Sequence, residues 1–306
     1  LSELRRTLLL YALLAVAVSG LLGWLAAHQG LAPLRAMRAQ AAAVSGHHFN
    51  ERMPVAAVPI EMADLAAELN GMLDRLREDY RRLAEFSSDL AHELRTPISN
   101  LLTQTQVALS SKRDAPTYRN ILASNAEELE RMARMVADML FLAKAERGMP
   151  LPNRERFSAA QEVQALLEFY DAVAEEKGIR LGVTGDGEID GDRLMFRRAV
   201  SNLLSNAVRH GDPGSPVTVK IGTSDEGVSI SVSNTADDID PALLTRLFDR
   251  FFRGDPSRAH PASEGAGLGL SITKAIVEAH GGDIAATSGD RTVRMVMRFP
   301  PSAAIS

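Results

Sequence analysis

The stretch SSDLAHELRTPISN, residues 87–100, is the most informative segment of this sequence. The acid Glu93 follows His92 directly, and Pro97 comes five positions after the histidine. Apolar residues recur every three or four positions, which predicts one amphipathic helix: Leu83, Phe86, Leu90, Leu94, Ile98 and Leu101. His92 falls roughly 160 to 200° around this helix from Leu90, so we expect it to face outward. Pro97 removes one backbone hydrogen bond and predicts a bend just past the histidine.

A second amphipathic helix follows the segment SKRDAPTY, residues 111–118. Its apolar face is predicted to contain Leu129, Met132, Val136, Met139 and Ala143, and it should end near Gly148 and Pro150. The two helices form a hairpin, which alone buries little apolar surface. Two copies packed as a four-helix bundle solve this problem, so a homodimer is expected.

Composition bounds the function of the whole chain. Its 306 residues are 45% hydrophobic and 24% charged with a net charge of -5, which is typical of folded protein. No basic face large enough to follow a phosphate backbone is evident, so nucleic-acid binding is not expected. The absence of cysteine excludes disulfides, thiolate zinc sites and thiol catalysis.

An uncharged run covers residues 8–27, roughly the 20 residues that a helix needs to cross a bilayer. A membrane span is favoured over a buried core helix or a signal peptide, since the run exceeds a signal h-region and lacks a small-residue cleavage site. Arginines flank it on both sides, so the charge bias leaves the orientation open. Because the chain starts with Leu1, residues 1–7 are interpreted as the end of a truncated upstream region.

Two segments with helical periodicity, residues 34–44 and 61–83, follow the span. The connector between them contains the helix-stopping residues Gly46, Pro54 and Pro59. The second segment has a narrow apolar stripe, typical of a helix with a helical partner, at Leu65, Leu69, Met72 and Leu76. His47 and His48 could be a metal pair, but a solvated loop fits adjacent histidines in a polar connector better. The region resembles a HAMP linker, with Pro33 and Glu61 at that family's proline and acid positions.

The C-terminal half mixes helices and strands, which predicts an α+β domain. Residues 179–185 look like a strand, and two alternating strands flank a turn at residues 225–227. Between them, a helix carries Asn202 and Asn206 on one face. An amide oxygen at this position can coordinate a Mg²⁺ ion that also holds phosphate oxygens. Arg209 and His210 follow on the same helix.

A glycine-rich segment, LFDRFFRGDPSRAHPASEGAGLGLSITKAIVEAHGG, covers residues 247–282. Its glycines Gly265, Gly267 and Gly269 would let backbone N–H groups approach phosphates closely. A helix is predicted to start near Leu268 and to point its positive end at those phosphates. Arg253 can add a direct phosphate contact.

These motifs, taken in order, resemble those of sensor histidine kinases. Residues 87–101 look like the H-box with phosphoacceptor His92 and acid Glu93, and Thr96 completes an E-x-x-T pattern. The segment NLLSNAVRH is similar to the N-box of the GHKL ATPases, whose second asparagine, here Asn206, is the magnesium ligand. The glycine segment resembles the second glycine box, preceded by a mobile ATP lid at 253–264 and by an F-box formed by Phe248, Phe251 and Phe252.

The chemistry of His92 fits this resemblance. Neutral imidazole is a competent nucleophile near pH 7, because an unperturbed histidine titrates at about 6.5. Glu93 can accept a hydrogen bond from the other ring N–H and so select the tautomer that attacks. By resemblance, Glu93 and Thr96 also orient water for dephosphorylation of the partner protein.

One stretch departs from the family. The first glycine box normally reads D-x-G-x-G, and its Asp binds the adenine amino group, whereas this chain has VSNTADDID, with Asn234 at the Asp position and no glycine. An asparagine oxygen can still accept from an amino group, without the charge-assisted part of the bond. The heavy-metal sensor subfamily, the copper and silver sensors, also tends to have Asn here, and the segment LGWLAAHQGLAPLRAM resembles its membrane exit.

The resemblance implies a multidomain protein: a transmembrane helix at 8–27, a HAMP linker at 28–82, a dimeric helical-hairpin four-helix bundle at 83–148, and an α+β GHKL (Bergerat) ATP-binding sandwich at 149–306. The expected function is a sensor kinase of the bacterial inner membrane with a cytoplasmic kinase part. It would autophosphorylate His92 from Mg²⁺-ATP and pass the group to an aspartate of a response regulator receiver domain. The alternative is a non-enzymatic scaffold whose degenerate first glycine box no longer binds ATP.

Overall fold

The computed structural model describes residues 2–30, 35, 60–145, 148, 151–252 and 267–301. These residues divide into two compact units, residues 1–92 and 93–306, each of which is considered by itself. Several predictions lie outside the described residues: those for Pro33, His47, His48, Arg253 and Gly265, the first helix of the HAMP linker, and the ATP lid at 253–264.

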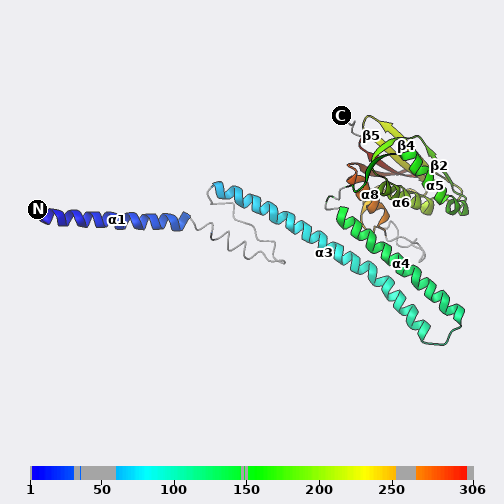
Figure 1. Cartoon of the computed structure of the whole chain (residues 1–306), viewed down its shortest axis with the longest axis horizontal. Helices are drawn as coiled ribbons and strands as arrows, with labels where there is room; N and C mark the ends of the chain where they lie inside the picture. The colour runs from blue at the N-terminus through cyan, green and yellow to red at the C-terminus, as the bar shows by residue number, and fades with distance from the viewer. Residues whose placement is uncertain are drawn as a thin grey trace. The chain divides into compact units, whose positions relative to one another are not determined.

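The first unit consists of long helices (Figure 1). Helix α1 spans Ser2–Gly30 and contains one candidate membrane span, Leu8–Gln29, which is identified by its length and composition. Helix α3 spans Ile60–Leu109 without a break, so Pro97 lies inside a continuous helix. The second HAMP segment and the helix of His92 are therefore one element.

In the second unit, the end of α3 and helix α4, Ala115–Ala145, form the predicted hairpin. The apolar face assigned to the second helix divides between two adjacent stripes. The buried stripe of α4 contains Met135, Met139 and Leu142, whereas Leu129 is 56% exposed. Leu129 instead belongs to a second stripe at spacings of four, three, four and three residues, formed by Leu122, Ala126, Leu129, Ala133 and Val136.

The rest of the second unit is a two-layer α+β domain. The strands are β1 (Arg154–Ser158), β2 (Arg180–Thr184), β3 (Glu188–Asp192), β4 (Pro216–Ser224), β5 (Gly227–Thr235), β6 (Asp283–Gly289) and β7 (Thr292–Phe299). The helices are α5 (Ala159–Glu176), α6 (Arg193–His210), the short α7 (Pro241–Leu244) with a 3-10 turn at Thr245–Phe248, and α8 (Gly269–Ala279).

Five strands form one sheet in the order β2-β4-β5-β7-β6, in which only the β2–β4 pair is parallel. Strands β1 and β3 form a separate antiparallel pair. Helices α5, α6 and α8 lie together on one face of the large sheet (Figure 1). Strand β5 alternates buried and half-buried residues, as expected for a sheet covered on one face.

The core lies between this sheet face and α6 and α8. Phe196, Val200, Leu203 and Leu204 of α6 are at most 1% exposed. Each such side chain contributes roughly 1.5 to 3 kcal/mol by leaving water. Phe196 also packs edge-on against Phe299 of β7, with ring centroids 5.8 Å apart. This packing fixes α6, the helix of the predicted magnesium ligand, on the sheet.

Candidate nucleotide and phosphoacceptor sites

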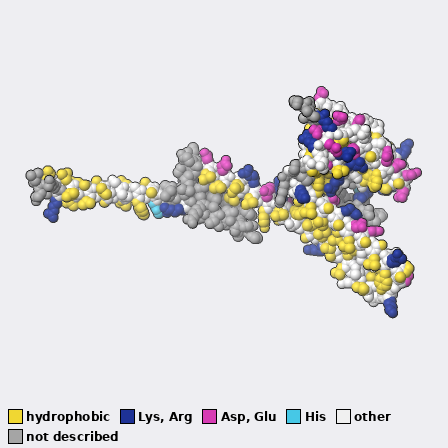
Figure 2. All heavy atoms as spheres, in the orientation of Figure 1, with side chains coloured by type: hydrophobic (Ala, Val, Ile, Leu, Met, Phe, Trp, Pro, Cys, Tyr) yellow, Lys and Arg dark blue, Asp and Glu magenta, His cyan; other side chains and the backbone are white. Residues whose placement is uncertain are grey.

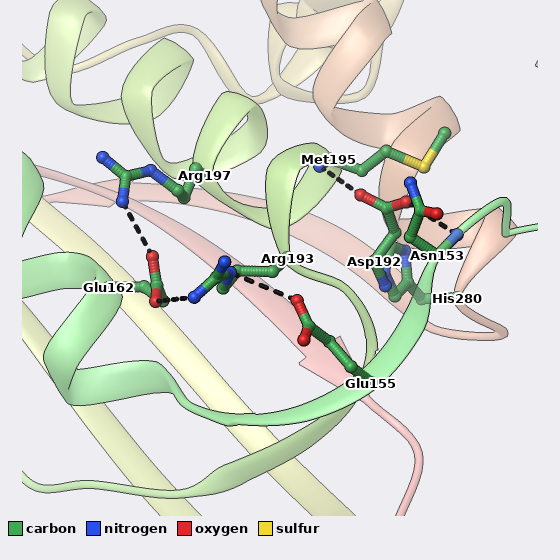
Figure 3. Close-up of polar contacts among 8 residues, drawn as sticks. All are labelled: Asn153, Glu155, Glu162, Asp192, Arg193, Met195, Arg197 and His280. Atoms are coloured by element: carbon green, nitrogen blue, oxygen red, sulfur yellow. Dashed lines mark hydrogen bonds and ion pairs between the residues drawn. The ribbon is translucent and has the colours of Figure 1, made fainter.

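Helix α6 begins at a buried, fully used aspartate. Asp192 is 2% exposed and is the N-cap, since its Oδ1 accepts from Met195 N at 2.9 Å. Its Oδ2 accepts from Asn153 N at 3.1 Å (Figure 3). The carboxylate thereby joins the segment before β1 to the start of the helix that carries both predicted asparagines.

His280, just after α8, also binds the residue at which α6 begins. Its Nε2 accepts from the backbone N–H of Asp192 at 3.0 Å, and its Nδ1 lies 2.7 Å from the carbonyl oxygen of Ile276. A backbone N–H only donates and a carbonyl only accepts, so the ring is neutral with its proton on Nδ1. Burial lowers the pKa of His280, against smaller opposing effects that include its hydrogen bond to Ile276.

Arginines of α6 tie its outer side to α5 and β1. Arg197 donates to Glu162 at 3.0 Å, Arg193 lies 3.8 Å from the same carboxylate, and Arg193 also lies 3.2 Å from Glu155 (Figure 3). The arginine side chains are about half exposed, so each pair contributes little by itself. Together they set the orientation of α6 relative to α5.

The predicted asparagines lie half-buried on one face of α6, while Leu203, Leu204, Ala207 and Val208 face the core. Asn202 donates through Nδ2 to the carbonyl oxygen of Gly269 at 3.0 Å. Its amide group therefore ties α6 to the first residue of α8. Asn206 lies one turn further along the same face, and Arg209 and His210 are exposed at the end of the helix.

The described part of the second glycine box needs glycine at one position. Gly267 has a φ of +69°, and a Cβ there would lie 2.9 Å from backbone atoms of Phe251. Phe251 N donates to the carbonyl oxygen of Gly267 at 3.1 Å, which joins the F-box to this turn. At Gly269 a Cβ would make ordinary contacts with Asn202, so sterics alone do not require glycine.

Among the described residues, no side chain caps the backbone groups at the start of helix α8. Its N-cap residue is Leu268, which is 2% exposed and makes no side-chain cap hydrogen bond. The N–H groups of the first turn of a helix attract anions. Phe248, Phe251 and Phe252 are half-buried, and Phe251 lies directly beside the Gly267 turn.

Asn234 lies at the end of the inward column of β5. Val228, Ile230 and Val232 precede it on the same buried face, and Asn234 is 8% exposed. A Cβ added to Gly211, just after α6, would lie 3.7 Å from the Cβ of Asn234. The amide is therefore next to the end of the helix that carries Asn206.

The missing glycines of the first glycine box are not required by the backbone. The pattern places Ala236 and Asp238 at the glycine positions. Among the described residues, the only non-glycine residues with positive φ are Phe251, Asp290 and Arg291. The loop after β5 therefore keeps to conformations that any residue adopts.

The phosphoacceptor candidates lie on α3. His92 and Thr96 are exposed, and Glu93 is half-buried. His92 is the last residue of the first compact unit, whereas the predicted nucleotide residues belong to the second. The structure thus brings Asn202, Gly267, Leu268 and Gly269 together, with Asn206 one turn along α6.

Sequence reasoning missed Asp192, His280 and the contacts of Arg291. An Asp directly before a helical run is a recognisable N-cap signal, so Asp192 could have been found. Nothing in the sequence indicates that His280 meets a residue 88 positions earlier.

Three family descriptions match the chain. "Histidine kinase-, DNA gyrase B-, and HSP90-like ATPase" matches residues 191–303, "His Kinase A (phospho-acceptor) domain" matches residues 82–148, and "HAMP domain" matches residues 25–78. Together they define the chain as a HAMP-linked kinase core with a phosphoacceptor domain.

Comparison with individual proteins narrows the family. The chain is 44% identical to sensor histidine kinase CusS of Escherichia coli K12 over 277 residues, 90% of this chain and 58% of that protein. It is also 42% identical to sensor protein CopS of Pseudomonas syringae pv. tomato over 257 residues, 83% of this chain and 52% of that protein. The chain therefore contains the HAMP, phosphoacceptor and ATPase domains of sensor histidine kinases, and it resembles sensor histidine kinase CusS and sensor protein CopS. It spans less than two thirds of the length of these relatives.

Solved structures agree on the fold. Acinetobacter baumannii histidine kinase AdeS has a TM-score of 0.56 at 21% identity and covers 68% of this chain and 97% of its own. These values indicate a shared fold of the hairpin and ATP-binding domain.

Proposed function

We propose that the chain is the membrane anchor and kinase core of a membrane-bound sensor histidine kinase. It transfers the γ-phosphoryl group of ATP to His92 and then to an aspartate of a response regulator receiver domain. The observation that carries this proposal is the bond of Asn202 to Gly269, which joins the predicted magnesium helix to the predicted phosphate helix.

The nucleotide site is proposed between these two helices. The triphosphate would meet the uncapped N–H groups of α8 and the Gly267 turn. Adenine would donate its amino group to the amide oxygen of Asn234. Arg209, His210, Arg253 and Gly265 remain proposed contacts of the bound nucleotide.

Magnesium fits a single protein ligand here. The described residues contain no group of three or more His, Asp or Glu side chains that could cage a metal ion. Mg²⁺ is commonly held by one or two protein oxygens together with substrate phosphates and water, which suits the amide oxygen of Asn206. When bound, the ion would neutralise charge on the phosphate oxygens.

His92 supplies the nucleophile in this proposal. Its exposed position on α3 leaves a ring nitrogen accessible to a docked γ-phosphate. Glu93 would hold the other ring N–H as the nitrogen–phosphorus bond forms and the bond from phosphorus to the ADP oxygen breaks. We further propose that Glu93 and Thr96, one turn apart, orient water for dephosphorylation of the regulator.

The partners and the membrane position are proposals of the same kind. A structure of the histidine kinase ThkA in complex with response regulator protein TrrA matches this chain with a TM-score of 0.59 at 20% identity, covering 74% of this chain and 64% of that one. This match supports a receiver domain as the partner. Helix α1 and the HAMP match support an inner-membrane anchor with a cytoplasmic kinase part. The proposed domain boundaries fall after residues 27, 82 and 148. The metal-sensing relatives support a metal-responsive input.

The hairpin supports a homodimer. Large apolar side chains remain exposed on both helices, namely Ile98, Leu102 and Leu109 of α3 and Leu122, Leu129 and Leu140 of α4. Figure 2 shows hydrophobic side chains gathered along the hairpin on the face in view. A second hairpin packed on these stripes would complete a four-helix bundle.

The decisive experiment uses the full chain in membranes with radiolabelled ATP. The wild type should acquire acid-labile, base-stable phosphate, and His92→Gln should acquire none while it still binds ATP, because an amide cannot form the phosphoramidate. His47→Gln is the control for loss of a histidine elsewhere. Label on His92→Gln would refute the phosphoacceptor assignment, and a wild type that binds no ATP would favour the scaffold.

A further inference from the structure

The loop that lacks glycines after β5 is held by a turn from the other end of the chain. Ala236 N donates to the carbonyl oxygen of Arg291 at 3.0 Å, and Arg291 N donates to Asp238 Oδ1 at 3.0 Å. Ile239 N donates to Ser288 Oγ at 2.9 Å. Three backbone N–H groups thus form hydrogen bonds that join residues 236–239 to residues 288–291. We call residues 288–291 the β6–β7 turn.

The backbone of the β6–β7 turn is strained. Its two central residues, Asp290 and Arg291, have φ values of +53° and +55°, and neither is glycine. Tight hairpin turns of this hand favour Asn-Gly or Asp-Gly, because a side chain disfavours the left-handed region. Such strain persists where surrounding contacts over-determine it, and here both backbone polar groups of Arg291 bind the opposite loop.

The side chain of Arg291 extends the same attachment. Its Nη2 donates to Asp212 at 2.7 Å and its Nη1 to Asp237 at 3.4 Å. Asp212 N in turn donates to the carbonyl oxygen of Thr235 at 2.8 Å. The arginine therefore links the loop to the residues that follow α6, although its side chain is 61% exposed and each ion pair contributes little.

The clamped loop begins two residues after Asn234. In the sheet, Asn234 is paired with Val293 and Thr235 with Thr292, directly beside the turn. We propose that Asp238, Ser288 and Arg291 are positioning residues of the nucleotide site, which hold Asn234 at the angle at which it selects adenine. This inference rests on the proposed function of Asn234 as the adenine acceptor.

The proposal predicts a change in base selectivity, which a merely structural role would not produce. Guanine has a carbonyl where adenine has its amino group, so an accurately placed acceptor favours ATP over GTP. Asp238→Ala removes the acceptor of Arg291 N, and with it one of the three backbone hydrogen bonds that hold the loop. Asp238→Asn keeps an oxygen at that position and should restore the wild-type behaviour.

The test measures dissociation constants of Mg²⁺-ATP and Mg²⁺-GTP for the full chain in nanodiscs. Asp238→Ala should weaken ATP binding about fivefold, the effect of one net hydrogen bond, and leave GTP binding unchanged. The preference for ATP over GTP should therefore also fall about fivefold. In phosphorylation assays its KM for ATP should rise while kcat stays constant. Arg298→Ala is the matched control, because Arg298 forms an equally exposed pair with Asp283 at the far end of the same two strands.

Other outcomes would overturn the proposal. Wild-type selectivity in Asp238→Ala would do so, as would an equal loss of ATP and GTP affinity. If Asp238→Ala does not fold, Ser288→Ala decides, since it removes one acceptor of the loop and should lower the ATP/GTP ratio about threefold. A wild type that binds no ATP would instead overturn the proposed function and this inference together, so the two failures are distinguishable.

Discussion

Helices α3 and α6 show how differently two regions of this molecule are stabilised. Eight of the 18 residues of α6 are buried, and the largest of them pack against the sheet of the same domain. Helix α3 is 50 residues long, and the buried apolar side chains among its described residues are Ala66, Leu73, Pro97 and Ala108. The longer helix thus leaves most of its apolar surface exposed.

This difference separates two kinds of dependence. The ATP-binding domain contains its own core, so a change there should alter folding or nucleotide chemistry within one subunit. The hairpin presents an apolar stripe that its own partner helix does not cover, so its stability should depend on a second copy and on concentration. Each prediction below changes residues in one of the two regions and should leave the properties of the other region unchanged.

The largest effect is expected at Asn206. Asn206→Asp should lower autophosphorylation about a hundredfold, because it adds negative charge beside the triphosphate, where electrostatic positioning carries most of the catalysis. Dimer formation should not change. Phosphorylation rates and sedimentation of the same preparation test both statements.

Asn202→Ala is the matched control for that variant. It removes the hydrogen bond to Gly269 and should lower the unfolding free energy of the ATP-binding domain by about 1 kcal/mol. Its loss of phosphorylation should be smaller than that of Asn206→Asp. Normal magnesium-dependent turnover in Asn206→Asp would count against its role as the ligand.

Changes to the exposed apolar side chains of the hairpin should prevent dimer formation. Leu122 and Leu129 are 66% and 56% exposed, and burying each against a second copy would contribute roughly 1.5 to 3 kcal/mol. The double variant Leu122→Glu, Leu129→Glu should therefore dissociate at protein concentrations at which the wild type is a dimer. Light scattering in detergent measures the mass.

Leu194→Glu is the control for this change. Leu194 is 68% exposed, but it lies on α6, in the region that contains its own core. It should leave the mass and ATP binding unchanged. If the hairpin variant stays dimeric, the exposed stripe is not the dimer interface.

The sequence was sufficient for features that depend on local spacing. The order of the H-box, N-box and glycine box identifies the kinds of domain, and the helix predicted to start near Leu268 begins at Gly269. Periodicity failed on α4, where two apolar stripes run one position apart. Leu129 and Met139 are predicted on one face, whereas only Met139 is buried, because spacing alone does not say which stripe is buried within the subunit.

Long-range contacts could not be predicted. Arg291 binds Asp237, which is 54 positions earlier, and nothing in the sequence around either residue indicates this contact. The two missing glycines suggested weaker nucleotide binding, since the sequence does not show that another segment holds the loop. Strands β6 and β7, which carry that segment, were not identified from the sequence.

A pH effect on the stability of the ATP-binding domain is expected from His280. Burial lowers the pKa of His280 below its usual value, so the unfolded chain binds a proton at a higher pH than the folded chain does. The domain should therefore lose stability as the pH falls below about 6.5, the ordinary value for histidine, until the folded pKa is reached. Denaturant unfolding from pH 8 to pH 5 measures this loss.

His92→Gln is the matched control for the pH series, since it removes a histidine that lies on α3, outside the domain whose unfolding is measured. His280→Gln should be less stable than the wild type at pH 8 but should show a flatter pH dependence. An unchanged slope in His280→Gln would mean that another group causes the loss.

The smallest effect is expected at Asn234, where the ATP-binding domain departs from its family. If the amide oxygen of Asn234 accepts from the adenine amino group, Asn234→Ala should weaken ATP binding by roughly 0.5 to 1.5 kcal/mol, the net contribution of a neutral hydrogen bond. Asn234→Asp should bind ATP at least as well as the wild type, because the acceptor becomes charged. Asn and Asp are nearly the same size, whereas Ala lacks three of the heavy atoms, and position 234 is 8% exposed in the folded domain. Thermal unfolding must therefore first show that each variant is folded. ATP affinity, measured by titration of the full chain, should then follow the order Asp, Asn, Ala. Equal affinities would mean that Asn234 does not face the base. The contacts of the β6–β7 turn with the loop after β5 would then not serve adenine selection.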